Sequence, residues 1–273
     1  RAPRTAARTD DRQKRQQRRT DRGSAACRLP AAPHLVIMPS IASLATDLRD
    51  QVGRVRLTTP AFVYSPLFYA WPVAEKYLKL GRGKKRAVFV GMNPGPFGMA
   101  QTGVPFGEVA AVRDWMRLGG EIGRPEREHP KRPVLGFDCK RSEVSGKRLW
   151  GAFSAKSPDP KKFFDEAFVL NYCPLLFLTE SGTNLTPDKL TKKERDAISK
   201  ICDEHLRAAL DVLDPEVAIG VGQYATDRLR IISPEKIPVS SILHPSPASP
   251  AANRDWIGDA RKSLAKVGLG HLM

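Results

Sequence analysis

Four short, mainly apolar runs lie along the chain, at residues 87–91, 167–171, 217–221 and 239–243. Apolar runs of this length, without regular polar alternation, are typical of strands buried on both faces of a parallel sheet. Segments with helical periodicity separate the runs. Strands that alternate with helices predict an α/β fold of three layers, in which helices cover both faces of a central four-stranded parallel sheet.

The clearest helical segment begins at Thr191, where Thr191 and Glu194 have the spacing of a capping box. Apolar residues follow at intervals of three and four up to Leu213. The same periodicity predicts helices over 109–118, 224–232 and 251–267. The residues of the last helix that we expect to face inward are Trp256, Ile257, Ala260, Leu264 and Val267. Residues 119–151, rich in glycine, proline and charge, are interpreted as an insertion with a surface excursion.

The formal net charge of +16 indicates a polyanionic partner. Residues 1–37 hold ten Lys and Arg against three Asp and Glu, so 35 and 26 remain in residues 38–273 and both parts are basic. The first part lacks apolar periodicity and is predicted to be a disordered basic tail, whereas 38–273 is predicted to be the folded domain. A solvated tail, or sequence upstream of a start at Met38, is favoured over a nucleic-acid-binding arm. We expect neither a secretory signal nor a membrane span.

The four cysteines are far apart in the sequence and form no C-x-x-C pair. Their spacing fits neither an iron–sulfur cluster nor a zinc site, so reduced thiols and an intracellular protein are expected. Cys202 falls on the apolar stripe of the helix that begins after Thr191, which predicts a place in the core.

The loop after the first strand, Gly91 to Gly98, holds three glycines, two prolines and one amide. Glycine allows backbone groups to approach a ligand, proline stiffens the path, and ligands of open α/β sheets bind beyond the carboxyl ends of strands. This loop is therefore a candidate binding loop, against the alternative of a tight turn without chemistry. A second loop, residues 181–187, is a candidate anion-binding nest, and an ordinary turn is an equal alternative.

Three of the predicted strands are followed by polar residues of distinct kinds. Asn93, Asn171 and His244 lie at or just after the ends of the first, second and fourth strands. Each residue alone is more often a turn, a cap or a structural group. Because the carboxyl ends of parallel strands share one edge of a sheet, we expect the three to converge there.

At these residues the chain resembles the single-strand-selective monofunctional uracil-DNA glycosylases. The similarity is carried by segments 91–108, 171–178 and 243–247, with further support from 64–71, 129–136 and 142–146. It extends from about Met38 to the end of the chain. Eighteen consecutive similar residues at 91–108 make it specific.

The resemblance implies a monofunctional glycosylase that hydrolyses the N-glycosidic bond of uracil in single- and double-stranded DNA and leaves an abasic site for base-excision repair. It implies that Asn93 positions the attacking water and that His244 donates a hydrogen bond to uracil O2. Asn171 would recognise the uracil edge, since one fixed amide pairs with N3–H and O4, and Phe106 would stack on the extruded base. Met92, Gly95 and Met99 would line the pocket, and the open space at Gly95 would admit 5-hydroxymethyluracil and related C5-oxidised uracils.

The resemblance also implies DNA contacts on either side of the pocket. Those after the catalytic histidine are Pro245, Ser246, Pro247 and Ala248, and the others are Ser181, Gly182, Thr183, Asn184, Lys189, Lys192, Lys193 and Arg195. Two positions depart from the family pattern. Ala248 stands where vertebrate members have arginine, and Asp255 stands where glycine is usual. The smaller, uncharged segment predicts a weaker hold on duplex DNA and a preference for single strands or mismatched uracil.

The implied enzyme needs no metal or organic cofactor and acts on DNA as a monomer inside the cell, in bacterial cytoplasm or nucleoid or in a eukaryotic nucleus. One alternative is a mismatch-directed uracil/thymine glycosylase, against which Asn171 and the first loop argue. The other is a catalytically silent DNA-binding module of the same fold.

Overall fold

The computed structural model describes residues 39–273, and the predicted basic tail, residues 1–37, lies outside the described residues. Its centre is a four-stranded parallel sheet in the order β3-β2-β6-β7. The strands are β2 (Ala87–Gly91), β3 (Ala167–Asn171), β6 (Val217–Val221) and β7 (Val239–Ile242). The predicted parallel sheet is therefore confirmed, with the last strand one residue shorter than expected.

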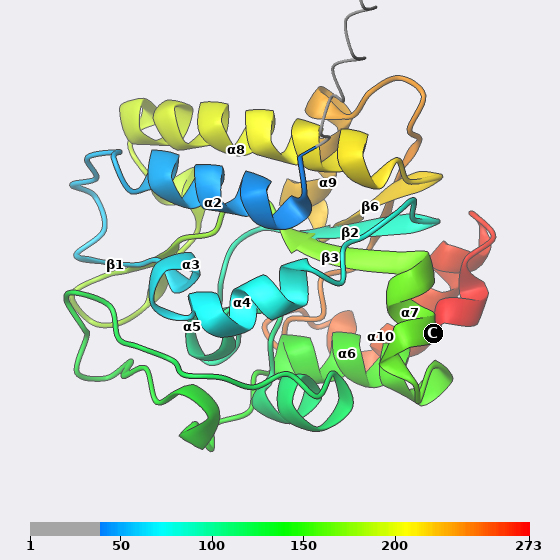
Figure 1. Cartoon of the computed structure of the whole chain (residues 1–273), viewed down its shortest axis with the longest axis horizontal. Coiled ribbons are helices and arrows are strands. Elements are labelled where there is room, and N and C mark those ends of the chain that lie inside the picture. The colour runs from blue at the N-terminus through cyan, green and yellow to red at the C-terminus, as the bar shows by residue number, and fades with distance from the viewer. Residues whose placement is uncertain (1–38) are drawn as a thin grey trace, which may run out of the picture. The chain divides into compact units, whose positions relative to one another are not determined.

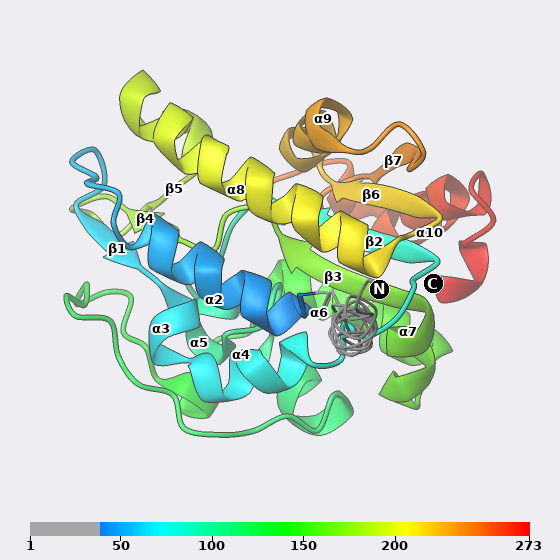
Figure 2. The same cartoon turned by 45° about the horizontal axis from the view of Figure 1, so that its top comes forward.

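Helices cover both faces of this sheet, as predicted (Figure 1). On one side lie α2 (Ile41–Val52), α8 (Lys192–Leu213) and α9 (Gln223–Ile232), and α2 runs beside α8 in both views (Figure 2). On the other side lie α6 (Val144–Lys156) and α10 (Ala252–Ala265). The remaining short helices are α3 (Pro66–Tyr69), α4 (Trp71–Leu78), α5 (Met99–Thr102) and α7 (Pro160–Glu166), with 3-10 turns at Gly136–Asp138, Pro187–Lys189 and Gly270–Leu272.

The helix after Thr191 begins as the sequence predicts. The Thr191 side chain accepts a hydrogen bond from the Glu194 amide, and the Glu194 carboxylate accepts one from the Thr191 amide, which completes the capping box. The same carboxylate accepts the Thr59 amide at 2.9 Å, so it also ties the chain before β1 to α8. Cys202 is fully buried on this helix, as expected. Among residues 39–273, no helix is both long and apolar enough to cross a membrane.

A second, antiparallel sheet joins β1 (Phe62–Tyr64), β4 (Leu176–Leu178) and β5 (Asn184–Leu185) in that order. The sequence did not predict it. Strands of two or three residues are too short to show a period, and the pairing of β1 with β4 joins segments more than one hundred residues apart.

Three helix predictions need correction. In the segment 109–118, residues 109–110 are α-helical, a π-helical turn follows at Ala111–Trp115, and residues 116–118 are not helical. The predicted insertion 119–151 is too long at its C-terminal end, because α6 begins at Val144 within it. On α10, Ile257 is 41% exposed, and non-helical backbone at Asp255 (φ −144°) interrupts the helix two residues before it. Val267 is 36% exposed and lies beyond the end of that helix.

Candidate active site

One cavity of about 400 Å³ lies beyond the carboxyl ends of β2, β3 and β7. Asn93, Asn171 and His244 all line it, so the structure brings together the three residues that the strand pattern singled out. All seven residues assigned to catalysis or base binding line this cavity: Met92, Asn93, Gly95, Met99, Phe106, Asn171 and His244. The volume is ordinary for a small-molecule site.

The side chain of Asn93 is held by the neighbouring loop. Its Nδ2 donates a hydrogen bond to the carbonyl oxygen of Leu175 at 3.2 Å. Leu175 follows β3 and precedes β4, so the segment between the two sheets fixes the amide. With Nδ2 engaged, Oδ1 is the end of the amide that is left to accept a hydrogen bond from water.

The Asn171 side chain is buried at the end of β3, with 9% of the residue exposed. Its Nδ2 donates to the thioether sulfur of Met99 at 3.3 Å. A Cβ on Gly91 would lie 2.5 Å from both Asn171 Oδ1 and Phe106 Cε2. Glycine at the end of β2 therefore leaves the space in which the amide and the phenyl ring pack together.

Phe106 adopts a left-handed backbone (φ +52°), which is uncommon for a bulky residue and persists where the surroundings enforce it. Two contacts with α6 enforce it here. The Trp150 indole donates to the carbonyl of Pro105 at 3.1 Å. A Cβ on Gly146 would lie 1.9 Å from the Phe106 carbonyl oxygen, so only glycine fits there. The N-terminal part of α6 thus sets the position of the Phe106 ring in the cavity.

His244 follows β7 and faces the same space. Its ring centroid is 5.9 Å from that of Phe106, with 43° between the planes. A Cβ on Gly222 would lie 2.9 Å from the His244 Cβ, so the left-handed glycine before α9 makes room for the imidazole. Burial lowers the pKa of His244 below its ordinary value. The imidazole is therefore neutral at neutral pH and can donate from one nitrogen.

Two residues that the sequence did not single out hold the loop after His244. Arg148 of α6 donates to the Pro245 carbonyl at 3.1 Å and to Asn253 Oδ1 at 2.9 Å. Asn253 in turn donates to the Pro247 carbonyl at 2.8 Å. Ser246 and Pro247 line the cavity, and Ala248 is exposed beyond them. No local sequence signal marks either residue. Arg148 lies about one hundred residues from Pro245 and Asn253, with which it forms these hydrogen bonds.

Glu143 is a cavity residue that sequence reasoning missed. It is the N-cap of α6, and its Oε2 accepts the Gly146 amide at 2.5 Å. Its Oε1 faces the first loop, where a Cβ on Gly95 would lie 3.7 Å away. Burial raises the pKa of the Glu143 carboxyl above its ordinary value. Glutamate is not a preferred N-cap, so local pattern gave no reason to place it here.

Residues 181–183 of the loop 181–187 belong to the hairpin turn between β4 and β5, and residues 184–185 form β5 itself. The Gly182 and Thr183 amides donate to Thr179, so both are used within the turn rather than directed at an anion. These two amides therefore fit the ordinary turn that the sequence left as an alternative, rather than an anion-binding nest. Asn184 and Thr186 line the cavity. The basic residues 189–195 do not line it: Lys189 pairs with Asp188 and Lys192 with Asp196.

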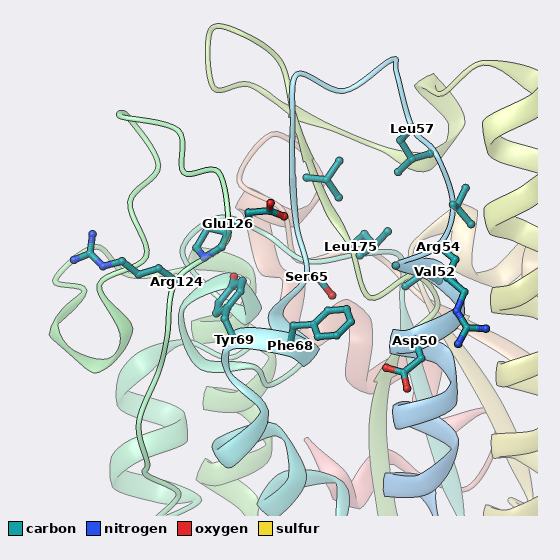
Figure 3. Close-up of a pocket in the computed structure, with 14 residues that line it drawn as sticks. Asp50, Val52, Arg54, Leu57, Ser65, Phe68, Tyr69, Arg124, Glu126 and Leu175 are labelled. Carbon is teal, nitrogen blue, oxygen red and sulfur yellow. The ribbon is translucent and has the colours of Figure 1, made fainter.

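A larger cavity, of about 720 Å³, lies on the other side of Leu175, which lines it (Figure 3). Phe68 and Tyr69 belong to its wall, and its charged lining residues are Asp50, Arg54, Arg124 and Glu126, two of each sign. None of the seven residues assigned to catalysis or base binding lines it. The convergent polar groups therefore lie in the smaller cavity.

The profile of the uracil DNA glycosylase superfamily matches residues 78–265. The single-strand selective monofunctional uracil-DNA glycosylase of Rattus norvegicus is 49% identical over 228 residues, which cover 81% of this chain and 82% of the rat protein. The protein of that name from Bos taurus is 44% identical over 260 residues, 88% of this chain and 95% of the bovine protein.

Among solved structures, the crystal structure of wild-type Pedobacter heparinus SMUG2 superposes with a TM-score of 0.56. The superposition covers 82% of this chain and 97% of the chain in that structure, at 14% sequence identity. At this identity the likeness shows the fold alone.

Proposed function

Since the chain belongs to the single-strand selective monofunctional uracil-DNA glycosylases, within the uracil DNA glycosylase superfamily, we propose that it hydrolyses the N-glycosidic bond of uracil in DNA and leaves an abasic site. Membership confirms the family resemblance and the predicted enzyme class, a hydrolase of N-glycosyl bonds. One observation carries the proposal for this chain. Asn93, Asn171 and His244, which follow three different strands, line a single cavity.

The proposed chemistry starts with cleavage of the bond between C1′ and N1, whose electron pair leaves with uracil. The sugar becomes oxocarbenium-like, so the attacking water needs orientation more than a strong base. Asn93 Oδ1 would accept a hydrogen bond from that water while Leu175 holds the other end of the amide. The proton that the water loses on bonding to C1′ passes to solvent, and the uracil anion takes one up. Neutral His244 would donate to uracil O2 as negative charge develops there. One such donor is worth about 2.7–4 kcal/mol.

Recognition of the base is assigned to Asn171 and Phe106. The Asn171 amide can pair with N3–H and O4 of uracil, whereas cytosine offers the reverse pattern and would leave buried groups unpaired. The Phe106 ring would stack on the base and contribute about 1–3 kcal/mol. Extrusion from a duplex costs a few kcal/mol and little from a single strand. This cost, together with the small side chain at Ala248, supports a preference for single strands over duplexes.

We extend the proposal to uracils with oxidised C5 substituents, such as 5-hydroxymethyluracil. The open side of the cavity at Gly95 supports it, since the nearest atom to a Cβ there is Glu143 Oε1 at 3.7 Å. The glycosylase domain is proposed to span residues 38–273 and to act as a monomer on cellular DNA.

Incubation with a uracil-containing oligonucleotide, followed by alkali, tests the function. Strand cleavage at uracil in the wild type and its loss in Asn93→Ala are the expected results. Binding without abasic sites would instead indicate a silent DNA-binding module. Excision of thymine from T:G pairs at a rate near that of uracil would indicate a mismatch-directed enzyme.

A further inference from the structure

Two arginines lie against one aromatic ring beside the active-site cavity, and each has a lysine next to it in the sequence. The Arg141 guanidinium lies 4.1 Å from the centroid of Phe97, and that of Arg132 lies 5.5 Å from it. Lys131 and Lys140 are the chain neighbours of these arginines, and both are exposed. We call Lys131, Arg132, Lys140 and Arg141 the Phe97 cation cluster. Pro96, next to Phe97, lines the cavity, so the cluster lies at the edge of the active-site loop.

The charges of this cluster are not neutralised locally. No carboxylate of residues 39–273 forms an ion pair within 4 Å with any of its four members. The basic segment at the start of α8 differs, since Lys189 and Lys192 each pair with an aspartate. Four cations held close together without counter-charges repel one another, and an anionic ligand relieves that repulsion.

The cluster is also partly preorganised. Phe97 holds the two guanidinium groups over its ring, and Arg132 Nη1 donates to the Lys131 carbonyl at 2.9 Å. Arginine held in this way loses less conformational freedom when it binds an anion, and its planar donors match phosphate oxygens. Lysine supplies a point charge to the same ligand. The set fits several consecutive phosphates better than one isolated ion.

We propose that the Phe97 cation cluster binds the backbone phosphates of the DNA strand that flanks the extruded nucleotide. This inference rests on the proposed glycosylase function, because the base cavity beside Pro96 is what places DNA here. It adds a contact that residues 181–195 and 245–248 do not supply. The occupant is the phosphate backbone, so binding should be independent of base sequence and strongly dependent on salt.

The test uses the full chain and a uracil-containing single strand. In the triple variant Lys131→Gln, Lys140→Gln, Arg141→Gln, three exposed cations are removed and partly buried Arg132 is kept. Each lost phosphate contact lowers the slope of log K against log[salt] by about 0.7 on a single strand, so a decrease of about 2 is expected. If the binding constants of wild type and variant become equal at 1 M salt, this difference in slope makes the variant bind about 100-fold more weakly than wild type at 0.1 M salt.

The matched control removes three cations from the opposite end of the sheet. Lys156, Lys161 and Lys162 are exposed on α6 and α7, just before β3 begins, and their change to Gln should leave the salt slope within about 0.5 of wild type. The charge-conserving variant Lys131→Arg, Lys140→Arg, Arg141→Lys should retain the wild-type slope. Circular dichroism and a melting curve check that each variant folds.

The outcomes separate this inference from the proposed function. The phosphate site is overturned if the folded triple variant keeps the wild-type salt slope. It is also overturned if the control variant lowers the slope as much as the triple variant does. In either case the proposed excision of uracil is unaffected. A wild type that neither binds nor cleaves the oligonucleotide overturns the glycosylase function itself. In the triple variant, the single-turnover rate at saturating enzyme should stay within about threefold of wild type, since no cavity residue is changed.

Discussion

The carbonyl oxygen of Leu175 accepts a hydrogen bond from the side-chain amide of Asn93 at 3.2 Å. Leu175 also lines the larger cavity, so it contacts a residue of the smaller cavity and forms part of the wall of the larger one. The bond fixes the amide with Oδ1 available to water. In the proposed mechanism, which needs an oriented nucleophile rather than a strong base, this contact would link the segment just before β4 to the orientation of the water.

We predict that Asn93→Ala lowers the single-turnover rate of uracil excision by at least about 100-fold, the usual cost of losing one preorganised polar group in an active site. The melting temperature should change little, because Asn93 is only partly buried. Asn184→Ala, which removes an amide from the exposed edge of the same cavity, is the control and should cost less than about tenfold. Equal losses in the two variants would contradict the role of Asn93.

Asn171→Asp should reverse the recognition of the base. The Nδ2 donor becomes an acceptor that faces uracil O4, so excision of uracil should fall by about 100-fold or more. Excision of cytosine, which presents a donor at N4, should rise from background. Oligonucleotides that contain each base, assayed side by side, measure both effects. An unchanged ratio of uracil to cytosine excision would show that Asn171 does not face that edge of the base.

Gly95→Ala tests the space assigned to C5 substituents. The new Cβ would make only ordinary contact with Glu143, so the fold should be unaffected. Loss of space for one methyl-sized group should lower excision of 5-hydroxymethyluracil by at least about tenfold relative to uracil. Gly151→Ala, on the exposed side of α6 where a Cβ meets nothing within 4 Å, is the matched control. Parallel decreases for both bases would place the C5 group elsewhere.

The pH dependence follows from the lowered pKa of His244. Because the neutral imidazole is the proposed donor, the single-turnover rate should be level above the ordinary histidine pKa of about 6.5 and should decline only at lower pH, where the ring is protonated. Glu143 lines the same cavity and burial raises its pKa, so the profile should be repeated in Glu143→Gln. A rate that falls tenfold per pH unit above pH 7 would require a cationic donor instead.

Ala248→Arg should increase activity on duplexes. Ala248 is exposed at the tip of the loop that Arg148 and Asn253 hold in place, so a longer side chain can reach DNA without repacking. One added stacking contact is worth about 1 kcal/mol, or about fivefold in rate. Wild-type rates should decrease from single strands to U:G to U:A, and the variant should narrow these differences. Equal wild-type rates on all three substrates would refute the strand preference.

Local sequence signals were sufficient for the main sheet and for α8. Uninterrupted apolar runs mark buried strands, and the capping box at Thr191 marks a helix start, because both depend on neighbours in the chain. The convergence of Asn93, Asn171 and His244 also followed, since parallel strands present their carboxyl ends at one edge. The identity of the base-binding residues came from the family resemblance.

Contacts between distant segments could not be inferred in this way. Residues 144–151, the first part of α6, fell within the predicted insertion because that segment is rich in glycine, proline and charge. Gly146 is nevertheless needed where the Phe106 carbonyl approaches α6. That packing places Glu143 and Arg148 at the site, and no local pattern encodes it. The Asp255 break and the pairing of β1 with β4 were missed for the same reason. Periodicity reports what neighbouring residues favour, whereas the cavity's shape results from contacts made once the whole chain has packed.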